Sequence, residues 1–134
     1  MKPDDDYLLK LGFAHYWFQY VEWGVIYALH HATGDDVSVL ATKTPRQLSN
    51  MLSDAWAGDL ALEPLAERYG ALVTDREHLA HSHPATYIHD GISEQRLRRH
   101  DIKYPKRPPT QIWITSEWLD TFIAAARTLN GDIP

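Results

Sequence analysis

Apolar residues recur at steps of three and four along the first part of the chain, in the series Leu8, Leu11, Ala14, Phe18, Val21, Val25 and Leu29. This period predicts an amphipathic helix over about residues 5–32. The acidic run Asp4-Asp5-Asp6 suits the positive N-terminal end of such a helix, and Gly34 suits its C-terminal end. The chain is therefore expected to begin with one long helix that buries a single stripe.

Four aromatic residues widen the apolar face of this first helix, namely Tyr16, Trp17, Tyr20 and Trp23. A helix that is apolar on more than one side needs more than one partner. It is either central in a helical bundle or half buried by another subunit. The sequence leaves both possibilities open.

A second helix is predicted over about residues 45–57. Thr44 is the expected N-cap, Pro45 takes the first helical position, and Gln47 can reach back to the cap. Its buried face is predicted to consist of Leu48, Met51, Leu52, Ala55 and Trp56.

Two further helices follow. The third is predicted over about residues 64–82, with a stripe of Leu65, Tyr69, Leu72, Arg76 and Leu79. Pro84 forces this helix to end, because the residue before a proline avoids the helical region. The last helix is predicted over about residues 116–130, capped by Thr115 or Ser116 and closed by Gly131.

The segment 84–115 shows no helical period. His89-Asp90-Gly91 is a turn signal, and Gln111–Thr115 reads as a short strand that pairs near Gln95–His100. The predicted fold is all-α, a bundle of four to five helices with a short extended or β-hairpin insertion before the last helix. One domain over residues 1–134 is expected from the length.

Composition narrows the functional classes. The chain has no cysteine, so disulfides and thiolate sites are excluded, which fits a reducing cytosol. No signal peptide is visible, and no apolar run approaches the ~20 residues that cross a bilayer. We predict a cytoplasmic protein that does not associate with membranes. A net charge of -5 argues mildly against broad binding to nucleic acids.

The positive charges are nevertheless concentrated, because six basic residues lie between Glu94 and Arg107. Candidate contacts to an RNA backbone in this segment are Arg96, Arg98, Arg99, Lys103 and Arg107. Each phosphate contact would make binding dependent on salt. The alternative is a solvated loop.

The most distinctive stretch, residues 75–84, holds one arginine and three histidines, namely Arg76, His78, His81 and His83. Arginine binds phosphate as a permanent cation, and histidine accepts and donates protons near neutral pH. Arg76 and His81 lie ~140° apart around a helix, so the two side chains of one helix do not readily contact the same atom of a substrate. Two copies across a twofold axis could bring two such pairs into one cleft.

A simpler interpretation places Arg76 at the edge of the core, with the aliphatic part of its side chain buried and its guanidinium paired with a carboxylate. Asp75, Glu77 and Glu22 are the candidate acids. In this reading the arginine is structural.

The run Arg76-Glu77-His78-Leu79-Ala80-His81 resembles the signature of the HEPN superfamily, an arginine followed after four to six residues by a histidine. The order of the predicted elements is similar as well, with a long first helix, a helical hairpin, the motif helix and a terminal helix. The resemblance implies a small helical protein that is usually dimeric. Many relatives are metal-independent endoribonucleases in toxin–antitoxin, abortive-infection or RNA-processing settings.

Under this resemblance Arg76 would stabilise the negative phosphorane, and His81 would act as general base or acid. The supporting residues would be Glu77, His78, His83 and Glu22. The expected product is a 2′,3′-cyclic phosphate, and no cofactor or metal is expected. The expected partners are a second copy of the chain, RNA, and a cognate antitoxin or other protein.

Two alternatives accompany this prediction. Glu77 stands where family nucleases often have Asn, Asp or His, and its negative charge beside Arg76 favours a non-catalytic interaction or RNA-binding module. A metal-dependent hydrolase is the third hypothesis. Its ligands would come from His78, His81, His83, His89 and Asp90, although structural zinc sites favour cysteine.

Overall fold

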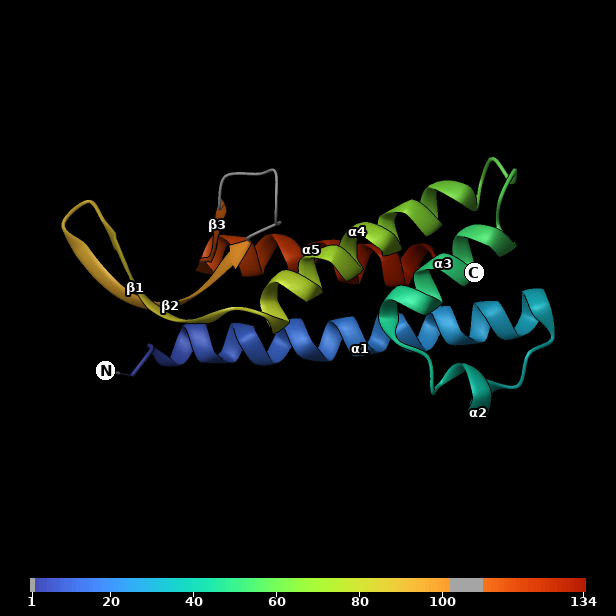
Figure 1. Ribbon diagram of the computed structural model, residues 1–134, viewed down its shortest axis with the longest axis horizontal. Helices are drawn as coiled ribbons and strands as arrows, with labels where there is room; N and C mark the ends of the chain where they lie inside the picture. The colour runs from blue at the N-terminus through green and yellow to red at the C-terminus, as the bar shows by residue number, and fades with distance from the viewer. Residues whose placement is uncertain (1, 102–109) are drawn as a thin grey trace.

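The computed structural model of the protein describes residues 2–101 and 110–134. In these ranges the chain forms five α-helices and one three-stranded antiparallel sheet (Figure 1). The helices are α1 (Asp5–Thr33), α2 (Val37–Leu40), α3 (Pro45–Ala55), α4 (Glu63–Ala80) and α5 (Ser116–Asp132). The strands are β1 (His83–His89), β2 (Ile92–Asp101) and β3 (Thr110–Ile114), in the order β1-β2-β3.

The prediction of an all-α bundle is wrong, because the segment between α4 and α5 builds a real sheet rather than a short insertion. β1 and β2 form a hairpin whose turn is Asp90-Gly91, with φ of 49° and 73°. Both values are positive, as a two-residue type I′ hairpin turn requires. The predicted pairing of the 111–115 segment with 95–100 is confirmed by the register of β2 and β3, in which Leu97 faces Ile114.

α1 is the spine of the helical part, and α3, α4 and α5 lie along one side of it (Figure 1). Most of its predicted stripe is buried, namely Ala14, Phe18, Val21, Val25 and Leu29. The helix ends as predicted at Gly34, which has φ of 77° and donates its N–H to the carbonyl of His30. Among the helices of the described ranges, none is both long enough and apolar enough to cross a bilayer.

The local signals of the other helices are also reflected in the structure. Thr44 and Gln47 form the predicted capping box of α3, with Pro45 at its start. α4 ends at Ala80, before Pro84. α5 runs through Gly131 to Asp132, beyond the predicted end. The short helix α2 was not predicted, since four residues are too few to show a period.

Tyr7 attaches the sheet to the N-terminal end of α1. Its buried hydroxyl donates a hydrogen bond to the Ile114 carbonyl at 2.6 Å and accepts one from the Leu97 N–H at 3.1 Å. One side chain therefore holds β2 and β3 together and fixes them against the helical part. This attachment determines where the cationic residues of β2 lie.

Candidate functional site

Arg76 lies half-buried on α4 and points toward α1, where its guanidinium carbon is 5.6 Å from the centre of the Phe18 ring. Within residues 2–101 and 110–134 it forms no ion pair within 4.0 Å and no hydrogen bond through its side chain. Its charge acts on Glu22 of α1, which is also half-buried. Burial raises the pKa of Glu22, and Arg76 opposes that increase.

Tyr69 completes this polar cluster between α1 and α4. Its ring stacks on Phe18 with 6.3 Å between the centres, and burial raises the pKa of its hydroxyl. In the described part of the chain this buried hydroxyl has no hydrogen-bond partner. A buried tyrosine hydroxyl normally has one, so the polar groups around Arg76 are incompletely paired.

Glu77 binds Arg46 of α3. The Arg46 Nη2 and Nε atoms donate to one Glu77 carboxylate oxygen at 3.0 and 3.2 Å. Arg46 Nη2 also donates to the Thr74 hydroxyl at 3.0 Å. Glu77, which was expected to neutralise Arg76, is therefore paired with Arg46 instead.

The histidines at the end of α4 have three different surroundings. The Arg99 guanidinium of β2 donates to His78 Nδ1 at 2.8 Å, which joins the strand to the helix. An arginine can only donate, so this contact needs His78 with an unprotonated Nδ1. His81 is the exposed C-cap residue of α4, and His83 is exposed at the start of β1. The structure brings His78 and Arg99 together but does not bring Arg76 and His81 together within one chain.

The basic residues of β2 are not equivalent. Arg96 is only 6% exposed, and it pairs with Asp4 at 2.9 Å and with Glu94. Arg98 is half-buried with its guanidinium 5.2 Å from the centre of the Trp113 indole ring. Lys103 and Arg107 lie outside the described residues. Among the predicted RNA contacts that the structure describes, Arg98 and Arg99 are the ones not enclosed by carboxylates.

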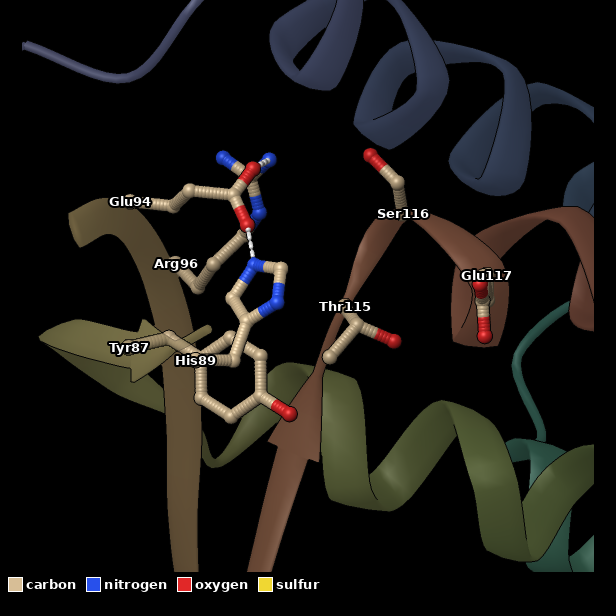
Figure 2. A pocket seen from close by; sticks show the side chains of 7 residues that line it. All are labelled: Tyr87, His89, Glu94, Arg96, Thr115, Ser116 and Glu117. Carbon is tan, nitrogen blue, oxygen red and sulfur yellow. Dashed lines mark hydrogen bonds and ion pairs between the residues drawn. The ribbon is translucent and has the colours of Figure 1, made fainter. Parts of the chain in front are cut away.

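A cleft of about 390 Å³ opens between the sheet and the start of α5 (Figure 2). Its lining residues are Tyr87, His89, Glu94, Arg96, Thr115, Ser116 and Glu117. His89 Nε2 is paired with the Glu94 carboxylate, and Glu94 also binds Arg96. His89, Glu94 and Arg96 are thus paired with one another, so they form a polar support for the sheet rather than a free acid–base pair.

The sequence interpretation did not recognise this cleft. The available signal was the two-residue spacing of Tyr87 with His89 and of Glu94 with Arg96, which places each pair on one face of a strand. His89 and Asp90 were considered as metal ligands. In the described ranges, no group of three or more His, Cys, Asp or Glu side chains is arranged to hold a metal ion.

The fold and the site define a helical protein with an antiparallel sheet, in which an arginine–histidine helix end adjoins a cationic strand. No family model, no curated protein and no solved structure matches the chain. Its function is therefore argued from the chemistry of its own residues.

Proposed function

We propose that this protein is a cytoplasmic, metal-independent endoribonuclease of the HEPN type, with Arg76 and His81 as catalytic residues of a homodimer. The observation that carries the proposal is the ion pair between Glu77 and Arg46 at 3.0 Å. Because Glu77 is held by Arg46, it does not cancel the charge of Arg76. Arg76 therefore keeps a positive charge for a phosphate.

The reaction needs one base and one acid. One copy of His81 removes the proton from a ribose 2′-hydroxyl, and that oxygen attacks the adjacent phosphorus. The bond from phosphorus to the 5′-oxygen breaks, and the second copy of His81 protonates the leaving oxygen. Arg76 stabilises the added negative charge on the phosphorane. The products are a 2′,3′-cyclic phosphate and a 5′-hydroxyl end.

The position of β2 supports RNA as the substrate. Arg99 of β2 contacts His78 on the last turn of α4, whereas Arg98 lies on the opposite face of the strand, over Trp113. A phosphate that contacts Arg99 therefore lies near the end of the helix that carries His81. Arg96 is not part of this proposed contact, because it is buried against Asp4 and Glu94.

A second function is favoured by one specific observation. Arg76 is half-buried over Phe18 and interacts with Glu22 across the helices, as a structural arginine would. In this second proposal the protein is a non-catalytic module that binds RNA, a cognate antitoxin or another protein. Such a module does not cleave RNA, so replacing Arg76 or His81 would have no effect on cleavage.

The deciding experiment incubates the folded protein with structured and single-stranded RNA in excess EDTA. We expect cleavage, with cyclic phosphate and 5′-hydroxyl ends identified by end-labelling and mass spectrometry. If both kinds of RNA remain intact, the nuclease proposal is wrong and the module is favoured. Cleavage that appears only after adding a divalent metal, with other end groups, also overturns it.

The role of the Glu77–Arg46 pair gives a separate prediction. Arg46→Ala releases Glu77, and we expect about a tenfold lower cleavage rate, equivalent to about 1.4 kcal/mol. The matched variant is Arg46→Ala combined with Glu77→Gln, which removes the released charge and should restore the rate. Thermal unfolding of both variants checks that the fold is retained. A double variant as slow as Arg46→Ala alone would show that the ion pair acts in another way.

A further inference from the structure

A second apolar stripe runs along the solvent side of α1 and is not covered by any described part of the chain. It consists of Leu9, Phe13, Tyr16, Tyr20, Trp23 and Tyr27, each between 44% and 57% exposed. The steps between them alternate between four and three residues. Alternating steps of four and three keep the six side chains on one face, which is the pattern of a helix that packs along its length against another helix.

The stripe is symmetric about its centre at position 18. Leu9 and Tyr27 are equally far from that point, as are Phe13 and Trp23, and Tyr16 and Tyr20. Two copies of α1 that pack antiparallel around a twofold axis therefore match a large side chain with a large side chain at every level. This is the self-complementary surface that a twofold dimer requires.

Polar residues continue the stripe at both ends. Asp5 lies one step before Leu9, in the first turn of α1, and His31 lies one step after Tyr27, in the last turn. Both are exposed, and Asp5 has its side chain 91% exposed even though it contacts Lys2. An antiparallel pair places Asp5 of each copy opposite His31 of the other. A parallel pair would place Asp5 against Asp5, which is unfavourable.

The stripe on α1 also has a depression at the position where a large side chain of the second copy would pack. A depression of about 500 Å³ is lined by Leu8, Leu9, Gly12, Phe13, Tyr16 and Trp17. A Cβ atom built at Gly12 meets nothing within 4 Å, so the floor of this hollow is open. In the antiparallel register Phe13 faces Trp23 of the second copy, and the hollow beside Phe13 has room for that indole.

The exposed area is sufficient for a stable pair. A large aromatic side chain contributes roughly 150–250 Å², so six half-exposed side chains offer on the order of 600 Å² per copy. Two such faces bury more than the roughly 1,000 Å² expected of a specific interface. We infer that α1 is the interface of an antiparallel homodimer of this chain. Arg76 lies over Phe18 on the opposite, buried side of α1, so two Arg76–His81 pairs would meet through a different surface. This inference therefore does not depend on RNA cleavage.

The experiment measures molar mass in solution by sedimentation over a wide concentration range. The wild-type chain is expected to be a dimer. Trp23→Lys, which introduces a charge into the stripe, is expected to weaken the dimer about a hundredfold or more, as at an interface hot spot. His15→Lys is the matched control, because His15 is exposed on the same helix about 100° around from Tyr16.

Circular dichroism of each variant shows whether the helices are retained. Tyr20→Lys is the second stripe variant, used if Trp23→Lys does not fold. A monomeric wild-type chain, or a folded Trp23→Lys or Tyr20→Lys variant with unchanged dimer affinity, overturns the inference. RNA cleavage is a different readout, so its failure would not be confused with this one.

The orientation is tested with single cysteines, which the absence of natural cysteines makes unambiguous. Leu9→Cys and Tyr27→Cys are prepared separately, mixed, and treated with a short bis-thiol cross-linker. The antiparallel register predicts efficient linkage in the mixture and little in either variant alone. Efficient linkage of each variant to itself would instead indicate a parallel pair and overturn the proposed register.

Discussion

His81→Ala is expected to lower the rate of RNA cleavage by about 10²–10⁴-fold, the usual contribution of a general acid or base. The fold should be retained, because His81 is exposed and the cap of α4 uses its backbone N–H, which bonds to the Glu77 carbonyl at 3.0 Å. Single-turnover cleavage in EDTA measures the rate, and thermal unfolding measures the fold.

Two variants make this result specific. His15→Ala removes another exposed histidine, on α1, and should leave the rate unchanged. Arg76→Lys keeps the positive charge but loses the planar fork, and it should lower the rate with less disturbance of the half-buried site than alanine. A folded His81→Ala variant that cleaves RNA at the wild-type rate would remove His81 from the mechanism.

Arg96→Ala is expected to lower the free energy of unfolding by about 3 kcal/mol, at the low end for breaking a buried ion pair. Arg96 is buried, pairs with Asp4 and Glu94, and lies 4.3 Å from the centre of the Tyr7 ring. Its removal leaves two carboxylates without their cation. The loss stays at the low end, because both carboxylates keep some solvent exposure.

Denaturant unfolding measures this loss, and Arg98→Ala is the matched control on the same strand. Arg98 lies over Trp113 with no carboxylate partner in the described ranges, so its removal should cost less than about 1 kcal/mol. Equal losses for the two variants would mean that the buried ion pairs of Arg96 contribute little to the fold.

The same contacts make the free energy of unfolding depend on pH. The Tyr7 N–H and then Arg96 hold the pKa of Asp4 below its usual value. The stability from a lowered pKa is present above the unfolded value, near about pH 4, and is lost as pH falls through the folded value. Asp4→Asn should therefore reduce the decrease of unfolding free energy between neutral and acidic pH. An unchanged pH profile would show that Asp4 does not contribute.

The long helices could be predicted from the sequence because their signals are local. The stripe of α1 and the capping box of Thr44 and Gln47 each depend on residues within a few turns of each other. The extent of the sheet was underestimated because His83–His89 buries neither face fully, and β2 is rich in charge. Neither strand shows the apolar alternation that marks a half-buried strand. The Asp90-Gly91 dipeptide was the one strong hairpin signal.

The candidate site was predictable only in part for the same physical reason. Residues near one another in sequence, such as Arg76 and His81, can be assigned to one helix end. Glu77 pairs with a residue 31 positions away, and Arg96 pairs with one 92 positions away. No local pattern indicates which charges such long-range contacts neutralise, so the burial of Arg96 and the occupation of Glu77 required the structure.

The packing of α1 on α5 has a consequence for how the chain acquires its fold. The first helix finds its most extensive partner in the last one, and Tyr7 bonds to Ile114, 107 residues further along. During synthesis the core face of α1 remains uncovered until α5 has left the ribosome. Chains interrupted before Ser116 are therefore expected to aggregate or to bind chaperones, and chains that include α5 should fold more slowly than a helical protein built from local contacts.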